Sequence, residues 1–402
     1  MSSRRHGNKH WSEQASSIKP NLAKPIDKPQ TNNPGSKQIM HRRITAFDYL
    51  RVTMIVLVLL HHSMLAYVSF LDFDDDPVDN VHPVIDDDKW DGFDIIIILN
   101  DTFVMPMLFL ISGLFVWPSY DRKGARLFLR DRFIRLGIPF AVCVPLLVPL
   151  AYYPAQLMIR YMGYGEFWYW MMRAGLGTTG HLWFIWLLLL FNCIIVLVYQ
   201  VFPDLESIVA RIGKRIFNHP GRFYLFMMGL STLLYLPMVI YLGPFYWRGL
   251  STFQVQMGRF LVYLSYFFVG SAIGMYGIRN TMFTTHGKLA GNWMPWLVFG
   301  FILGVLFYWL WFTIACAAIV LGIIGLYLSG PMRRNFLMES LSRNAYGMYI
   351  FHFVIVTWLQ YMFLGTAFTP VFKVTIVFFG TFFMSWGGTA ALRKITGIDR
   401  VL

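Results

Sequence analysis

The stretch Tyr49–Leu65, YLRVTMIVLVLLHHSML, has the apolarity of a membrane-spanning helix but carries an arginine and two adjacent histidines. Arg51 precedes nine apolar or weakly polar residues, and His61 and His62 follow them. In an α-helix, Arg51 and His62 would lie within about 20° of each other and about 16 Å apart along the axis, whereas His61 would point about 100° away from His62. Because about 16 Å is only half the hydrocarbon thickness, Arg51 or His62 must face a bundle interior or a wet cavity, unless both serve as anchors at the two membrane surfaces.

The composition of the chain also indicates a membrane protein. Of the 402 residues, 56% are hydrophobic, 18% are aromatic and only 14% are charged, and a soluble domain of this length carries far more charge. The three cysteines lie in apolar runs, so they predict neither a disulfide framework nor a zinc site. We expect no bound metal.

Ten apolar stretches approach the length of about 20 residues that a bilayer-spanning helix needs. They are 47–69, 94–117, 134–153, 182–202, 223–242, 257–276, 293–309, 311–328, 345–364 and 371–391. The expected fold is an all-α polytopic membrane protein with about ten transmembrane helices. Residues 1–43 are expected to form a basic disordered cytoplasmic tail, residues 44–392 the transmembrane domain, and residues 393–402 a second cytoplasmic tail.

The distribution of charge predicts the orientation. The two termini and every second connecting segment, with Arg135 at the start of the third span counted among them, contain 27 of the 34 Lys and Arg residues. This excess of positive charge places these segments in the cytoplasm. The first outside loop, 70–93, carries nine aspartates and one lysine. Its stretch Asp74–Asn80 lacks the glycine and distal glutamate of an EF-hand loop, so calcium binding is not favoured. The net charge of +13 therefore follows from membrane insertion and requires no nucleic-acid partner.

An acidic residue in the second span is a candidate partner for His62. Asn100 and Asp101 lie about two turns from the outer end of that span, and His62 approaches the outer end of the first. A carboxylate beside an imidazole fixes its tautomer and suits it to act as a general base. A hydrogen bond between helices is the alternative role for Asp101.

Arginines gather just before the third span. The cytoplasmic segment 119–140 contains Arg126, Arg130, Arg132 and Arg135. Helical spacing would place Arg132 and Arg135 on neighbouring faces, where they could clamp an anion such as a phosphate group. Ordinary positive-inside charge is the alternative explanation.

These motifs, in this order, resemble the acyltransferase-3 family of membrane O-acyltransferases. They are R-x10-H (Arg51 to His62), F-x-M-P-x-x-F-x-I-S-G (Phe103 to Gly113), R-x-x-R with G-I-P-F (Arg132 to Phe140), G-H-L-W-F-I-W (from Gly180) and N-A-Y-G-M-Y-I-F-H (from Asn344). The resemblance covers residues 45 to about 392. Among the members, the chain is most similar to the branch of periplasmic glucan succinyltransferases.

The resemblance implies transfer of an acetyl or succinyl group from cytoplasmic acyl-coenzyme A to a hydroxyl of a glycan outside the bacterial inner membrane. In the family, the histidine of R-x10-H is catalytic, which corresponds to His62. The R-x-x-R arginines are linked to the acyl donor, which corresponds to Arg132 and Arg135. We expect Arg130 and Arg51 to be further basic contacts of the donor, and Arg51 to belong, with His62 and Asp101, to the catalytic residues. The resemblance leaves open whether His62 acts as a base or carries the acyl group.

Four further residues are candidate contacts of the acceptor: His181, Trp183, Tyr346 and His352. Aromatic faces stack on sugar rings, although an interfacial aromatic belt and a hydrogen-bonded core histidine are equally good explanations. A small-molecule or glycan transporter, and a protein that binds a donor without chemistry, are the alternative functions. Substitution of His62 would abolish turnover by an enzyme, whereas a transporter would often tolerate it.

Overall fold

The computed structural model describes residues 34–72, 82–159, 162–173, 178–243, 246–250, 253–285, 287–306, 308–330, 334–398 and 401. Residues 1–33 of the predicted tail and 73–81 of the aspartate-rich loop lie outside the described residues. Residues up to His41 form a unit by themselves, and the arrangement below is that of Arg42–Leu402.

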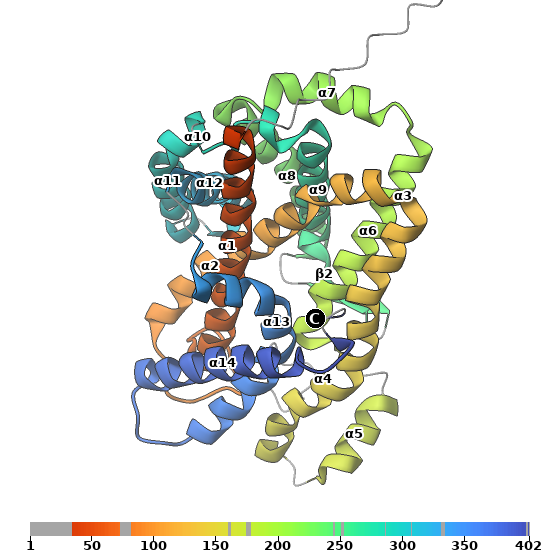
Figure 1. The fold of residues 1–402 in the computed structure, drawn as a ribbon. Coiled ribbons are helices and arrows are strands. Elements are labelled where there is room, and N and C mark those ends of the chain that lie inside the picture. Colours follow the sequence, from red (N-terminus) through yellow and green to blue (C-terminus); the bar gives the residue numbers. More distant parts are fainter. Residues whose placement is uncertain are drawn as a thin grey trace, which may run out of the picture. The chain divides into compact units, whose positions relative to one another are not determined.

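Helices form nearly all of the described secondary structure (Figure 1). The α-helices are α1 (Pro34–Met64), α2 (Asp91–Leu114), α3 (Val116–Arg132), α4 (Ile138–Ile159), α5 (Tyr164–Arg173), α6 (Trp183–Val201), α7 (Leu205–Ile216), α8 (Pro220–Leu242), α9 (Met257–Tyr276), α10 (Lys288–Gly291), α11 (Trp293–Leu306), α12 (Tyr308–Ser329), α13 (Phe336–Phe363) and α14 (Pro370–Leu392). Shorter turns are η1 (Leu65–Tyr67), η2 (Phe133–Gly137), η3 (Gly180–Leu182) and η4 (Ile278–Asn280). Helix α1 thus begins inside the segment predicted to be a disordered tail.

Within the described residues, eight helical segments are long and apolar enough to cross a membrane. They correspond to eight of the ten predicted spans. The predicted span 293–309 is the shorter helix α11, and 345–364 lies in α13, which is not among the eight. Helix α13 is less apolar because it carries buried polar side chains, among them His352, Thr357 and Gln360. The chain is an all-α polytopic membrane protein, as predicted.

Glycines bring α2 and α9 into close contact. A Cβ atom added to Gly270 would lie 2.2 Å from the carbonyl oxygen of Leu110, and one added to Gly274 would lie 2.4 Å from that of Leu114. Such G-x-x-x-G spacing lets helix backbones approach in a membrane, where lipid supplies no hydrophobic drive for association. This contact places Asp101 on α2 opposite the start of α9.

A short hairpin precedes α9. Strands β1 (Trp247–Leu250) and β2 (Phe253–Gln256) pair antiparallel, with Trp247 opposite Gln256. The indole of Trp186 on α6 donates a hydrogen bond of 3.3 Å to the carbonyl oxygen of Gln254. The hairpin therefore packs on α6, an arrangement that the apolar pattern did not predict.

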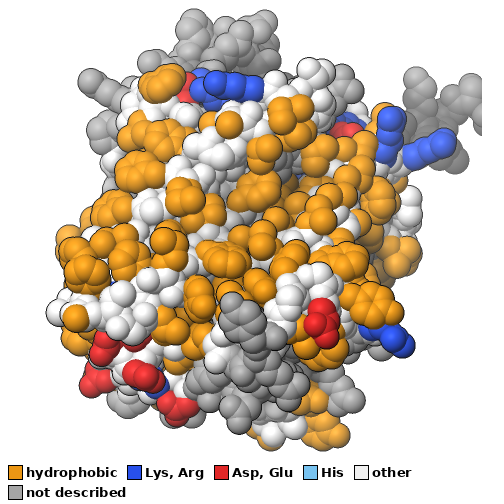
Figure 2. Space-filling model, turned by 90° about the horizontal axis from the view of Figure 1, so that it is seen from below, with side chains coloured by type: hydrophobic (Ala, Val, Ile, Leu, Met, Phe, Trp, Pro, Cys, Tyr) orange, Lys and Arg blue, Asp and Glu red, His pale blue; other side chains and the backbone are white. Residues whose placement is uncertain are grey.

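Apolar side chains are exposed on the helices as well as buried between them. On the face shown in Figure 2, hydrophobic side chains lie beside one another over most of the surface, and charged side chains are few. Exposed examples on α8 and α14 are Leu225, Leu233, Leu236, Ile240, Phe372, Phe379, Phe383 and Met384. A soluble monomer rarely exposes so much apolar surface, so these side chains are suited to contact lipid.

Candidate functional site

The rings of His62, His82, His181 and His352, defined here as the histidine cluster, come together from four separate parts of the chain. The ring centroid of His62 lies 5.2 Å from that of His352 and 6.3 Å from that of His82. His181 lies 4.8 Å from His352, and the Phe353 ring packs 5.0 Å from both His62 and His181. Because α1, the outer loop, η3 and α13 each contribute one ring, the cluster forms only in the folded chain.

Backbone carbonyl groups fix the proton position on two of these rings. His181 Nε2 lies 2.9 Å from the oxygen of Ile350, and His352 Nδ1 lies 2.6 Å from the oxygen of Tyr349. A carbonyl oxygen can only accept a hydrogen bond, so these nitrogens carry the hydrogens of the neutral rings. The other nitrogens, His181 Nδ1 and His352 Nε2, are then acceptors, and both are buried without a partner among the described residues.

Gln360 on α13 fixes the proton on the third ring. Its amide nitrogen donates to the carbonyl oxygens of His62 and Ser63, at 3.0 Å and 3.2 Å. Its amide oxygen therefore faces His82 Nε2, at 2.7 Å, and must accept a hydrogen from it. His82 Nδ1 is left as a third buried acceptor without a partner among the described residues.

His62 differs from the other three because neither of its ring nitrogens has a described hydrogen bond, and its Nδ1 is buried. The rings of His61, His82, His352 and Phe353 pack around it, at centroid distances of 5.5, 6.3, 5.2 and 5.0 Å. No hydrogen bond among the described residues therefore fixes which nitrogen of the neutral His62 ring carries the hydrogen. Within the described residues, no group of three or more His, Cys, Asp or Glu side chains is placed to hold a metal ion.

Asp101 has a different partner from the one that the sequence led us to expect. Its carboxylate oxygen Oδ2 lies 2.6 Å from Nη1 of Arg259 on α9, and the Arg259 guanidinium lies 4.4 Å above the Phe312 ring. The side chain of Arg259 is only 1% exposed. Asp101 interacts electrostatically with His61, the histidine that was predicted to point away from His62. Because α2 and α9 meet at this level, Asp101 links two helices, which is the alternative role that the sequence offered, and a catalytic pairing with His62 stays a prediction.

Arg259 was not among the predicted site residues, although the sequence carried a signal for it. Arg259 lies inside the predicted span 257–276, and a charged side chain within a span demands an internal partner. Asp101 is a carboxylate inside another predicted span, so an ion pair between these two residues was an available prediction.

Arg51 lies on α1 together with His62, as predicted, and its guanidinium is accessible. Its Nη2 is 3.4 Å from Oδ1 of Asp48, and the two side chains are 45% and 36% exposed. Arg334 also interacts electrostatically with Asp48. An exposed pair of this kind is weak, so Arg51 remains able to bind an anion.

The R-x-x-R motif lies at a π-helical turn. The backbone N–H of Ile138 bonds to the carbonyl oxygen of Phe133, five residues earlier, in η2. Pro139 has no N–H with which to bond the carbonyl oxygen of Arg135, and its ring would crowd that oxygen in a regular helix. The hydroxyl of Tyr346 on α13 instead donates to this oxygen, at 2.6 Å. Such π-helical turns are frequent at functional sites.

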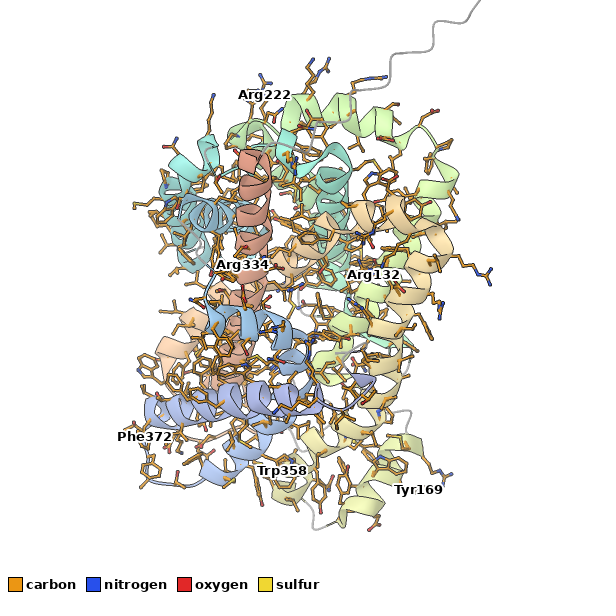
Figure 3. The ribbon with its side chains drawn as sticks, in the orientation of Figure 1. Arg132, Tyr169, Arg222, Arg334, Trp358 and Phe372 are labelled. Carbon is orange, nitrogen blue, oxygen red and sulfur yellow. The ribbon has the colours of Figure 1, made fainter. Side chains whose placement is uncertain are left out.

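The arginines of this motif are close enough to interact. Arg132 and Arg135 repel each other electrostatically, and the Arg132 guanidinium lies 4.9 Å above the Phe128 ring. Arg130 and Arg135 are exposed, whereas Arg132 is half-buried. Figure 3 shows Arg132 between Arg222, near the α7 end of the view, and Tyr169, near the α5 end. Two neighbouring positive charges favour an anionic ligand.

The four predicted acceptor contacts divide into three groups. His181 and His352 lie in the histidine cluster with His62. Trp183 is buried, and its ring packs 5.7 Å from Trp247 of the hairpin and 5.6 Å from Tyr263, so the structure does not leave its face open to a sugar. Tyr346 contacts the R-x-x-R turn, not the rings around His62.

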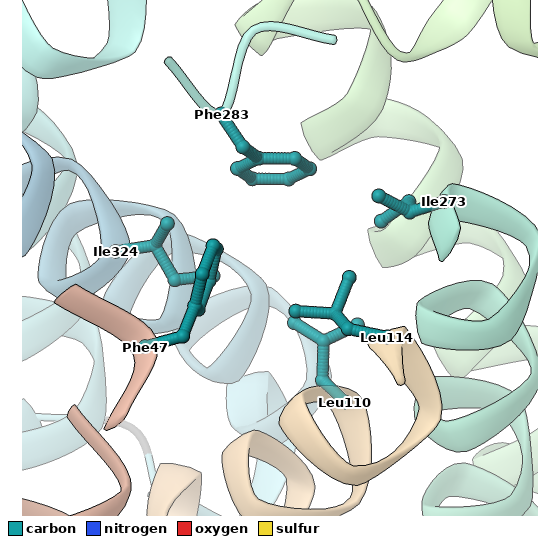
Figure 4. A pocket seen from close by; sticks show the side chains of 6 residues that line it. All are labelled: Phe47, Leu110, Leu114, Ile273, Phe283 and Ile324. Atoms are coloured by element: carbon teal, nitrogen blue, oxygen red, sulfur yellow. The ribbon is translucent and has the colours of Figure 1, made fainter. Parts of the chain in front are cut away.

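A small apolar hollow lies elsewhere along α1. It is too small to hold a water molecule and is lined by Phe47, Leu110, Leu114, Ile273, Phe283 and Ile324 (Figure 4). Phe47 precedes His62 by fifteen residues, about 22 Å along a helix. The lining of this hollow has no polar side chain to orient a charged donor or a sugar. The histidine cluster is therefore the better candidate site.

Comparison with known proteins identifies the family. The acyltransferase-3 family, described as an acyltransferase domain, matches residues 44–390. Searches of the curated proteins and of the solved structures found no match. The similarity to the glucan succinyltransferase branch therefore stays a prediction. Because the match spans well over half of the chain and includes both the histidine cluster and the R-x-x-R turn, the protein belongs to the acyltransferase-3 family and is a membrane acyltransferase.

Proposed function

We propose that the protein transfers an acetyl or succinyl group from acyl-coenzyme A, bound on the cytoplasmic side, to a glycan hydroxyl outside the bacterial inner membrane. One observation carries this proposal. Helix α13 contacts both the donor arginines and the candidate base, because Tyr346 bonds to the Arg135 turn and the His352 ring packs on His62. Tyr346 and His352 are six residues apart, a rise of about 9 Å along a helix.

The donor is proposed to bind at the arginines. Coenzyme A carries several phosphate charges, and Arg132 and Arg135 form a pair of neighbouring cations with Arg130 beside them. Arg51 offers a further accessible guanidinium on α1. Arginine suits this role because its planar fork binds phosphate oxygens in pairs. The flexible arm of the donor would then carry the thioester toward His62.

His62 is proposed to act as the general base. It takes the proton of the acceptor hydroxyl while the hydroxyl oxygen attacks the thioester carbonyl carbon. The carbon–sulfur bond breaks, and the departing thiolate takes the proton from His62. The products are an acyl ester and coenzyme A with a free thiol, so atoms and charge balance.

The test is product analysis with the purified full-length protein in detergent. Acetyl- or succinyl-coenzyme A is supplied with a soluble glucan, and thiol release and the mass of the glucan are measured. We expect an ester on the glucan with one of the two donors, removed by mild alkali. A folded protein that binds coenzyme A but esterifies the glucan with neither donor would contradict the proposed donor–acceptor pair.

A further inference from the structure

His82 stands beside the candidate base although it belongs to the aspartate-rich outer loop. Its side chain is fully buried. Its ring lies nearly parallel to that of His62, at an interplanar angle of 22° and a centroid distance of 6.3 Å. The Phe353 ring packs against its edge at 5.6 Å. A histidine in a polar, translocated loop would ordinarily be solvated, so its burial here requires a reason.

Three sets of contacts hold the loop segment after His82 in place. Backbone N–H groups of Asp86 and Trp90 donate to the carbonyl oxygens of Ala66 and Tyr67, at 2.8 Å and 3.0 Å. Nζ of the buried Lys373 lies 2.9 Å from a carboxylate oxygen of Asp86. The third contact is the bond from His82 itself to Gln360. The segment is thus fixed to η1, α14 and α13.

Gln360 connects His82 directly to the base. The same amide group that accepts from His82 Nε2 donates to the carbonyl oxygen of His62. A movement of the His82 ring therefore disturbs both the backbone and the ring packing of His62. Burial lowers the pKa of His82 to about 4, so the ring is uncharged at neutral pH and does not oppose a positive charge on His62.

We propose that His82 is a positioning residue for the catalytic base: its uncharged ring, held by Gln360, packs against His62 and keeps that imidazole in its working orientation. This inference rests on the proposed function. It gives the described part of the acidic loop a role in catalysis, since the loop delivers the ring that completes the site. His82 acts through packing and takes no part in proton transfer.

The test compares variants of His82 in steady-state turnover, with thiol release measured at saturating donor and glucan. His82→Leu removes the ring and is expected to lower kcat by about tenfold or more while both KM values stay within about twofold. His82→Phe restores a flat uncharged ring and is expected to recover most of the lost kcat. If His82→Leu does not fold, His82→Gln replaces it, because it keeps the bond to Gln360 but lacks the ring.

Each outcome decides the inference. An unchanged kcat in the variant without the ring, or a loss in His82→Phe as large as in His82→Leu, overturns the positioning role. A change confined to the KM of the glucan also overturns it, because His82 would then be an acceptor contact. His219→Phe, an exposed histidine at the start of α8, is the matched control. A wild-type protein without turnover would instead count against the proposed function.

Discussion

The hydroxyl of Tyr346 donates a hydrogen bond of 2.6 Å to the carbonyl oxygen of Arg135. The bond exists because Pro139, four residues after Arg135, has no N–H to offer that oxygen. A side chain of α13 thus completes the backbone bonding of the turn that carries Arg132 and Arg135. If these arginines bind the donor, as proposed, Tyr346 lies beside the donor, whereas the sequence had suggested an acceptor contact.

Replacing Tyr346 with Phe tests this relationship. The variant keeps the ring but removes one hydrogen bond, a loss of about 1 kcal/mol. If loss of this bond loosens the turn that holds Arg135, binding of acyl-coenzyme A should weaken by the same free energy. The KM for acyl-coenzyme A should then rise about fivefold with little change in kcat. Tyr361→Phe, the same change further along α13, is the control. If the KM for the glucan rises instead, Tyr346 contacts the acceptor and not the donor.

Asp101→Asn separates a structural role from a catalytic one. It removes the negative charge opposite the buried Arg259 and should destabilise the protein by about 3 kcal/mol, seen as a lower thermal midpoint in detergent. Turnover per folded molecule should remain within about threefold of wild type, whereas loss of a base-orienting group would cost about a hundredfold or more. The double variant Asp101→Asn, Arg259→Gln should recover part of the stability. A hundredfold loss of kcat in a stable Asp101→Asn protein would restore Asp101 to the catalytic site.

Lys373→Met tests the anchor of the outer loop. Lys373 is fully buried and lies 2.9 Å from both Asp86 and Asp88. Removing its charge leaves the buried Asp86 carboxylate uncompensated, a cost of about 3–5 kcal/mol. Adding Asp86→Leu should restore much of the thermal midpoint, because an apolar pair can replace a buried ion pair. An unchanged midpoint in the single variant would show that the loop is held in another way.

The burial of His82 predicts an acid-sensitive contribution to stability. Its folded-state pKa is lowered by burial from 6.5 to about 4, with the Gln360 bond acting in the opposite direction. Above pH 6.5 the ring is neutral in both states, and below it the unfolded chain binds the proton first. Stability is therefore lost as the pH falls toward 4, by about 3 kcal/mol at most.

The pH series compares the free energy of unfolding of wild type with that of His82→Leu between pH 7 and 4. The difference in the free energy of unfolding between the two proteins should become smaller toward acid pH, because only the wild type carries this titrating ring. A constant difference would mean that the ring of His82 is solvated.

The sequence predicted those parts of the fold that depend on local pattern. Apolar length identified eight of the ten predicted spans as membrane-crossing helices, and the first of them carries both Arg51 and His62. It could not say which spans touch, and for this reason Asp101 was assigned to His62 although the glycine contact of α2 with α9 brings it to Arg259. The burial of His82 was equally hidden, because an acidic loop gives no local sign that it folds back between helices.

The most direct test of the account is turnover by two variants of adjacent histidines, His62→Gln and His61→Gln, measured as release of coenzyme A thiol in the presence of the soluble glucan. We predict that His62→Gln loses at least about a thousandfold in kcat while still binding acyl-coenzyme A. His61→Gln should keep more than about a third of the wild-type kcat. Equal activity in the two variants would contradict the assignment of His62 as the catalytic base.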